Sequence, residues 1–216
     1  MIARAPMLGL LAALATTAGA HAVDKPLSFR EIKFRSTVRQ QFDFSCGAAT
    51  LATILTFYFG RPTPEIEVMN ILRSRYPDQD WKGLQDRGFS FDDLIWTARR
   101  LGFEGEGGEI APSGLEKLNG PVIVHLDRGK FQHFSVVRAV KAGNVFLSDP
   151  IVGAVTMSMG EFERQYTGRA LAIWRKGSPL PRDAILARPS PPIDPSIIIE
   201  GAAIPHANPL NPMIGR

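Results

Sequence analysis

The only cysteine in the chain, Cys46, opens an apolar segment that runs to Phe59 and is followed by Gly60. Ser45 is a residue type favoured at helix N-caps and glycine is common just beyond helix C-termini, so we expect one largely buried helix with Cys46 in its first turn. The free amide groups and the dipole at a helix N-terminus favour the thiolate, which is the reactive form of cysteine. Gly47 would leave the backbone beside the sulfur open to a substrate carbonyl. The alternative is an inert core residue, since free cysteine is among the most buried residue types.

The first 22 residues have the layout of a cleavable secretory signal. One positive charge, Arg4, precedes an apolar stretch over residues 7–15 and small residues at Ala18, Ala20 and Ala22. We expect cleavage after Ala22, with Ala20 as the second choice. An uncleaved anchor is the rival interpretation, but the apolar stretch is short for spanning a bilayer. The mature protein is therefore expected to be periplasmic or secreted, without a membrane span.

Composition narrows the function further. One cysteine excludes an intramolecular disulfide, and a lone thiol in an oxidising compartment is easier to understand if chemistry requires it. The length of 216 residues, with 44% hydrophobic and 21% charged residues, suits one well-buried domain. The net charge of +4 is mild and the basic residues are scattered, so no nucleic-acid partner is expected.

Helix signals fill the first half of the mature chain and strand signals fill the second. Helices are expected over residues 63–75, 90–101, 113–116 and 158–166. Strands are expected over residues 121–126, 131–140, 144–148, 154–157 and 170–174. Turn signals at 127–129 and 142–144 predict an antiparallel meander, and helices followed by strands indicate an α+β fold.

Three segments lack a strong periodic signal. Residues 23–39 are expected to be a lead-in with one short strand at 32–34, residues 77–88 to be a loop bordering the cleft, and Gly107-Gly108 to lie in a loop.

Nine of the 17 prolines fall in the last 40 residues, which predicts an extended tail over 177–216 rather than a second domain. The expected organisation is a signal peptide (1–22), one domain (23–176) and this tail.

Thiol catalysis needs an imidazole beside the sulfur and a group that orients the imidazole. His133 lies on a predicted strand, and the turn at 142–144 would bring Asp149 of the next strand beside it. His125 lacks an equivalent partner and is interpreted as structural. His206, in the proline-rich tail, is a poor candidate for the base.

The order of these motifs resembles the C39 family of papain-like cysteine peptidases, also known as bacteriocin-processing or double-glycine peptidases. The resemblance rests on Gln40-x5-Cys46-Gly47, His133-Phe134 and Asp149-Pro150, and it covers roughly residues 36–174. It implies a papain-like α+β fold with an N-terminal helical half packed on a C-terminal antiparallel sheet. It also implies Cys46 as nucleophile, His133 as general base and acid, Asp149 as the group that orients the imidazole and Gln40 as the oxyanion donor.

Two details of the motif stay open. Gln41 is the neighbouring alternative to Gln40 as oxyanion donor. Ser45 stands where the family often has aspartate before its Cys-Gly pair, a departure that bears on leader recognition.

The resemblance implies an endopeptidase that needs no metal or organic cofactor and acts on a peptide or protein substrate, in the family often after a Gly-Gly leader. Many members are domains of transporters, whereas this chain resembles the freestanding exported form, with secretion-system components as expected partners. The main alternative is a catalytically silent leader-binding or secretion-accessory module. A third is group transfer or amide hydrolysis by another papain-like relative.

Overall fold

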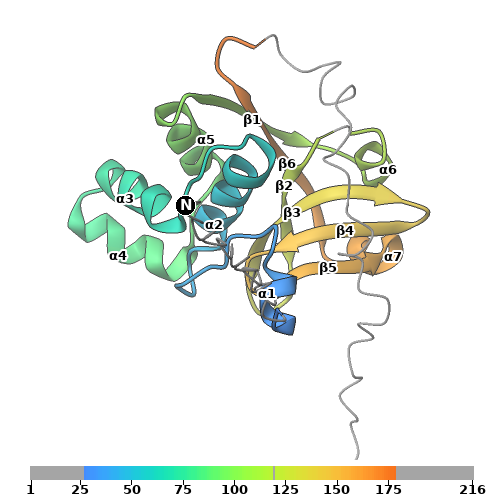
Figure 1. Cartoon of the computed structure of the whole chain (residues 1–216). Coiled ribbons are helices and arrows are strands. Elements are labelled where there is room, and N and C mark those ends of the chain that lie inside the picture. The colour runs from blue at the N-terminus through green and yellow to red at the C-terminus, as the bar shows by residue number, and fades with distance from the viewer. Residues whose placement is uncertain (1–26, 119, 179–216) are drawn as a thin grey trace, which may run out of the picture.

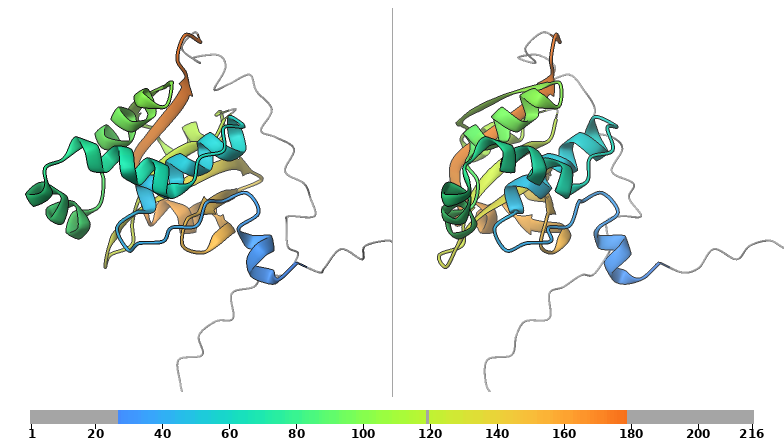
Figure 2. Two further views of the ribbon diagram at one scale, coloured as in Figure 1. Left: turned by 60° about the vertical axis from the view of Figure 1, so that its left-hand side comes forward. Right: turned by 90° about the vertical axis from the view of Figure 1, so that its left-hand side faces the viewer.

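Most of the helical residues lie on one side of the computed structural model and the sheet lies on the other, with two short helices beside the sheet (Figure 1). The structure describes residues 27–118 and 120–178. The predicted signal segment, nearly all of the predicted tail, and His206 lie outside these residues. The turned views show the helical side lying against one face of the sheet (Figure 2). No helix in the described part of the chain is both long enough and apolar enough to cross a membrane.

The elements follow the predicted order, with helices first and strands later. The helical elements are α1 (Phe29–Lys33), α2 (Cys46–Thr53), the π-helical turn η1 (Ile54–Tyr58), α3 (Glu65–Arg75), α4 (Asp78–Arg87), α5 (Phe91–Arg100), α6 (Pro112–Leu115) and α7 (Met159–Glu163). The strands are β1 (Phe103–Glu109), β2 (Val122–Asp127), β3 (Gln132–Lys141), β4 (Asn144–Asp149), β5 (Gly153–Ser158) and β6 (Tyr166–Arg175). The predicted α+β class is confirmed.

The strands form one antiparallel sheet in the order β1-β6-β2-β3-β4-β5. Strands β2 to β5 are the predicted meander. Ala142 and Gly143, which join β3 to β4, both have positive φ angles, 50° and 72°, as a two-residue hairpin turn requires. Strand β6 pairs with β2 on one side and with β1 on the other, so β1 and β5 are the edge strands of the sheet.

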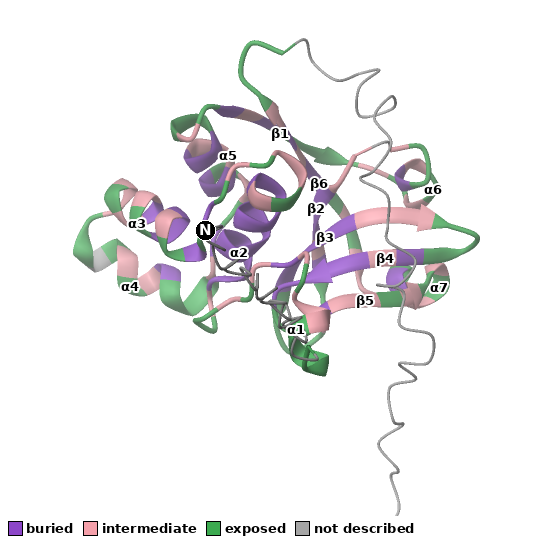
Figure 3. Cartoon of the chain, viewed as in Figure 1, coloured by how far each residue is buried: buried purple, intermediate pink, exposed green. Residues whose placement is uncertain are grey.

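The central strands of the sheet are buried over much of their length (Figure 3). Their side chains alternate between two clusters, one on each face of the sheet. On the helical face, Ile123, Phe134 and Leu171 pack into a cluster that contains the apolar residues of α2 and α5. On the other face, Val124 packs into a cluster covered by α6 and α7. Cys46 belongs to the first cluster, so the helix that carries it is fixed against the sheet.

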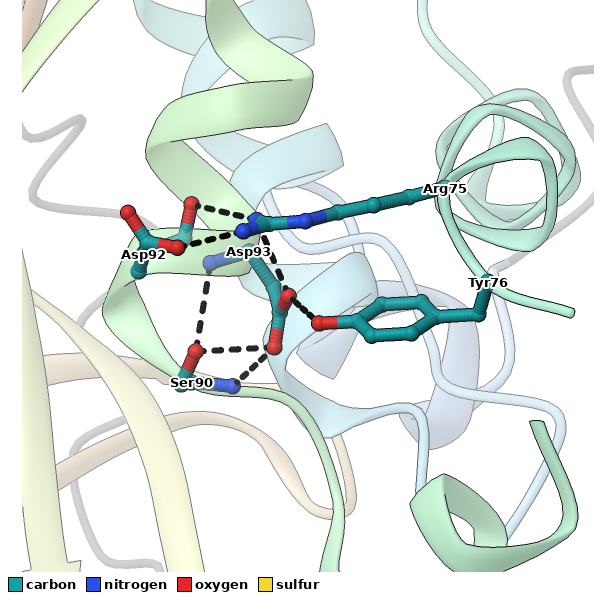
Figure 4. A network of polar contacts seen from close by, with 5 residues as sticks. All are labelled: Arg75, Tyr76, Ser90, Asp92 and Asp93. Carbon is teal, nitrogen blue, oxygen red and sulfur yellow. Dashed lines mark hydrogen bonds and ion pairs between the residues drawn. The ribbon is translucent and has the colours of Figure 1, made fainter. Parts of the chain in front are cut away.

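A polar network joins the C-terminal end of α3 to the N-terminus of α5 (Figure 4). Ser90 and Asp93 form a capping box, as the sequence predicts, with Asp93 N donating to Ser90 Oγ (3.2 Å) and Ser90 N to Asp93 Oδ2 (2.8 Å). Arg75 pairs with Asp92 and Asp93, and the Tyr76 hydroxyl donates to Asp93. Burial, together with the bond to this carboxylate and its charge, raises the pKa of Tyr76 to about 12.

Two segments predicted as strand or loop are helices. The strand expected at 32–34 is wrong, because Ser28 and Glu31 form a capping box that starts α1. The loop expected over 77–88 is also wrong, because Pro77 precedes the ten-residue helix α4. Among the residues of α4 whose burial is described, Leu84 alone is fully buried, and Trp81 is partly buried in the same cluster. This narrow apolar face did not stand out in a segment of polar composition.

The Gly107-Gly108 pair is part of strand β1, not of a loop. Gly107 pairs with Leu171 and Gly108 with Ala170 of β6. A strand interior with two adjacent glycines has little local preference for an extended backbone. Here the pairing with β6 imposes the conformation, which the local sequence could not reveal.

Candidate active site

Cys46 is the first residue of α2 and keeps 9% of its surface exposed. Ser45 occupies the N-cap position, but its side chain does not cap the helix. Its hydroxyl donates instead to Glu65 Oε1 (2.5 Å), and the Phe42 carbonyl oxygen lies 2.8 Å from the same Oγ as an alternative acceptor. The sulfur therefore lies at the N-terminal end of a buried helix. The turn before it is held by the contact between Ser45 and Glu65 of α3.

Gly47 has a packing role rather than the predicted role of opening the backbone to a substrate. A Cβ atom at this position would lie 3.2 Å from Phe134 Cδ2 and 3.3 Å from Leu94 Cδ2. The glycine thus lets α2 approach both β3 and α5 closely.

His133 lies between Cys46 and Asp149. Its Nε2 is 2.9 Å from Asp149 Oδ2, across the neighbouring strands β3 and β4, and the Cys46 side chain is close enough to the ring to raise its pKa. Since Nε2 is engaged by a carboxylate, we assign its proton to Nε2, which leaves the Nδ1 lone pair for the thiol. The structure therefore brings three of the four predicted site residues into one connected set.

Asp149 is fully buried and accepts four hydrogen bonds. Oδ2 receives His133 Nε2 and Arg128 Nη2 (2.8 Å), and Oδ1 receives the amides of Ile151 (2.8 Å) and Val152 (3.2 Å). Burial alone would raise the pKa of Asp149, but the bond to His133, the charges of His133 and Arg128, and the Ile151 amide lower it to about 2. The carboxylate is thus ionised at neutral pH.

The pKa of His133 is raised above its ordinary value. Burial lowers the pKa of this imidazole, but the hydrogen bonds to Asp149 and Cys46 and the attraction of their negative charges raise it by more. Because a raised pKa means that the charged form is favoured, His133 is suited to hold a proton taken from the thiol.

Gln40 is attached to the same region through its backbone. Its amide donates to the carbonyl of Pro150 (3.0 Å), the residue after Asp149, and its side-chain Nε2 donates to the Phe42 carbonyl (3.0 Å). One Nε2 hydrogen is thus left over. Gln41 has an exposed side chain, and its backbone amide is bound by Glu65.

His125 lies apart from this set, facing β6. Its Nδ1 is 3.0 Å from Thr167 Oγ1 and 3.2 Å from Arg169 Nη2. Burial and the positive charge of Arg169 lower the pKa of His125. The ring therefore tends to be neutral, as its interpretation as a structural residue requires.

Sequence reasoning missed Arg128 and Glu65, which hold Asp149 and the turn before Cys46. Arg128 stands inside a turn signal, Asp127-Arg128-Gly129, and Glu65 inside a helix-start signal. Each was explained by its local pattern. Neither pattern indicates a contact 20 or more residues away in the chain.

Comparison with known proteins gives matches over the same region. The model of the Peptidase C39 family matches residues 35–178. A "Probable functional amyloid protease FapD" from Pseudomonas aeruginosa is 31% identical over 167 residues, which is 74% of this chain and 73% of that protein. A protein with the same description from Pseudomonas fluorescens is 29% identical over 183 residues, 85% of this chain and 79% of that protein.

Solved structures agree on the fold. The peptidase domain of Streptococcus ComA, a bifunctional ABC transporter, superposes with a TM-score of 0.56 at 24% identity, covering 65% of this chain and 98% of that domain. A double glycine motif protease from an AMS/PCAT transporter, solved with its leader peptide, gives a TM-score of 0.53 at 28% identity, covering 64% of this chain and 89% of that structure. With the family model matched over more than half of its length, the chain belongs to the Peptidase C39 family and is a cysteine peptidase.

Proposed function

We propose that this protein is an exported thiol endopeptidase that cuts a secreted peptide or protein substrate. Cys46 is the nucleophile, His133 the general base and acid, Asp149 the residue that orients the imidazole, and Gln40 an oxyanion donor. The observation that carries the proposal is the position of His133, hydrogen-bonded to an ionised, buried carboxylate and close enough to Cys46 for that side chain to raise the pKa of the imidazole.

The reaction begins when Nδ1 of His133 takes the thiol proton and the Cys46 sulfur attacks the substrate carbonyl carbon. The resulting oxyanion accepts hydrogen bonds from the Cys46 amide and from the free Nε2 hydrogen of Gln40. The imidazolium then protonates the leaving amine as the C–N bond breaks, which leaves a thioester. Water, deprotonated by His133, attacks the thioester carbonyl and releases the carboxylic acid, and the proton returns to the sulfur.

The names of the relatives favour a secreted substrate. The two FapD proteins are described as probable functional amyloid proteases, and the AMS/PCAT neighbour is a double glycine motif protease solved in complex with the leader peptide. We infer a substrate that is itself exported through a secretion system, and a preference for a Gly-Gly leader is the first specificity to test.

The endopeptidase reaction is tested by mass spectrometry of exported peptides encoded beside this gene. Cells with the unmodified protein should release a shortened product, and cells with Cys46→Ala should accumulate the full-length form, which still binds the variant. A shortened product in the Cys46→Ala cells would overturn the proposal. Full-length product in both strains, together with binding, would favour the catalytically silent accessory module.

The thiol–imidazole pair is tested without a substrate, by measuring alkylation of Cys46 with iodoacetamide near neutral pH. His133→Ala should slow alkylation by about tenfold or more, because the sulfur loses its proton acceptor. His125→Ala is the matched control, since that histidine contacts Thr167 and Arg169 instead, and it should leave the rate nearly unchanged. Equal rates in the His133→Ala variant and the unmodified protein would contradict the pairing.

A further inference from the structure

Arg128 shares one carboxylate oxygen with the imidazole. Its Nη2 lies 2.8 Å from Asp149 Oδ2, and His133 Nε2 lies 2.9 Å from the same atom. The Asp149 side chain is fully buried, whereas that of Arg128 keeps 21% of its surface exposed. The guanidinium therefore reaches the buried end of the Cys46–His133–Asp149 set from the surface of the molecule.

The turn between β2 and β3 holds Arg128 in this position. The Arg128 amide donates to the Phe131 carbonyl (3.1 Å), and its own carbonyl accepts from the Lys130 amide (2.8 Å). Strand β3 begins directly after this turn and carries His133. The guanidinium and the imidazole are thus presented to Asp149 by one hairpin.

Two positive groups around one negative group have a definite electrostatic consequence. Asp149 alone would stabilise an imidazolium strongly, because the pair is shielded from water. A permanently charged guanidinium on the same oxygen offsets part of that attraction and repels the second positive charge. The imidazolium is then less stable, and the ring returns its proton more readily.

We propose that Arg128 is a positioning residue that fixes the Asp149 carboxylate and weakens its hold on the protonated His133, so that the imidazolium can release its proton to the leaving amine. This assignment rests on the proposed function, which requires His133 both to take and to give a proton. The other titratable group that acts on the ring within the described residues is Cys46 on α2, and the charge of His133 in turn lowers the pKa of His125 on β2.

The test is an NMR titration of the His133 ring, whose signals are assigned by their loss in His133→Asn. Arg128→Met removes the guanidinium and should raise the midpoint of the titration by about half a pH unit or more. Arg128→Gln keeps a hydrogen-bond donor without the charge, so it should shift the midpoint in the same direction. Arg128→Lys keeps the charge and should titrate close to the unmodified protein.

Lys130→Met is the matched control, because Lys130 is an exposed residue of the same turn and its loss removes the same unit charge. It should move the midpoint by no more than about 0.2 pH unit, as screening by water predicts. An unchanged or lowered midpoint in both Arg128→Met and Arg128→Gln would overturn the proposal, as would an equal shift in Lys130→Met. The titration needs no substrate, so failure of peptide cleavage would refute the proposed function without deciding the role of Arg128.

Discussion

Glu65 is buried, with 1% of its surface exposed, and it holds the turn that separates Gln40 from Cys46. Its carboxylate accepts the Gln41 amide at both oxygens (3.0 and 3.2 Å) and the Ser45 hydroxyl at Oε1 (2.5 Å). The Glu65 carboxylate of α3 thus lies beside Ser45, the residue before the predicted nucleophile. The Peptidase C39 family often has aspartate at the position of Ser45. The predicted nucleophile and oxyanion donor flank a segment that Glu65 fixes at two points.

We expect Glu65→Ala to lower the free energy of unfolding by roughly 2–4 kcal/mol, because the buried donors of Gln41 and Ser45 lose their acceptor. Chemical denaturation at pH 7 measures the loss. Glu67→Ala is the control: its carboxylate is two residues further along α3, is 34% exposed and pairs with Arg61, so its loss should cost less than about 1 kcal/mol. Equal losses of unfolding free energy in the two variants would show that the buried contacts of Glu65 stabilise the fold no more than the exposed ion pair of Glu67.

The pH dependence of this effect has a definite sign. Burial raises the pKa of Glu65 above 4.5, although the bonds from Ser45 and Gln41 lower it. The folded protein therefore keeps this proton at pH values where the unfolded chain has released it. The part of the Glu65 contribution that depends on its proton is thus fully present below pH 4.5 and is lost as the pH rises through the raised pKa, whereas the hydrogen bonds that the carboxylate accepts remain at pH 7. Glu65→Ala should remove this slope.

At the level of elements, local signals decided where most helices begin and end. Ser90 and Asp93 set the start of α5, and Ser158 caps α7 through the Glu161 amide (3.2 Å). The helix that begins at Cys46 reaches Tyr58, with the predicted last residue Phe59 at the C-cap, and Gly60 with φ 68° follows. Its last turn is π-helical, which local composition does not distinguish from α-helix.

We expect Ser90→Ala to cost about 1–2 kcal/mol of unfolding free energy, because α5 loses its cap and the buried Asp93 loses a donor. Urea denaturation compares this variant with Ser28→Ala. Ser28 forms the same capping box on α1, a helix without buried residues, so its loss should cost less than about 0.5 kcal/mol. The prediction fails if the Ser28 variant is destabilised as much as the Ser90 variant.

On the scale of the whole molecule, residues 34–40 form a strap between the helical side and the sheet. The Val38 amide donates to Thr53 Oγ1 of α2 (2.9 Å), and Ser148 Oγ of β4 donates to the Ser36 carbonyl (3.2 Å). The strap ends at Gln40, whose amide binds the Pro150 carbonyl. The position of Gln40 near Asp149 therefore depends on contacts between segments about 110 residues apart.

Gly153, the first residue of β5, packs closely against Lys33, the residue that precedes this strap. A Cβ there would lie 2.5 Å from the Lys33 carbonyl oxygen, at a φ of 81°. We expect Gly153→Ala to lower the unfolding free energy by about 2–4 kcal/mol, through overpacking and backbone strain. Gly143→Ala is the control, with φ 72° and open space around its Cβ, and should cost about 1 kcal/mol. Similar melting temperatures for the two variants would contradict close packing between Gly153 and Lys33 at the end of α1.

The sequence by itself determined the α+β class, most helix starts and the meander, because caps, turn residues and strand periodicity act over a few residues. It also predicted Cys46, His133 and Asp149 as site residues from their chemistry and order, and Gln40 from the family resemblance. Only the tertiary structure decided that α4 is a helix and that Gly107-Gly108 is strand. It also decided that Arg128 and Glu65 support the site. The physical reason is range: these features depend on burial, pairing and charge between residues that meet only when the chain is folded.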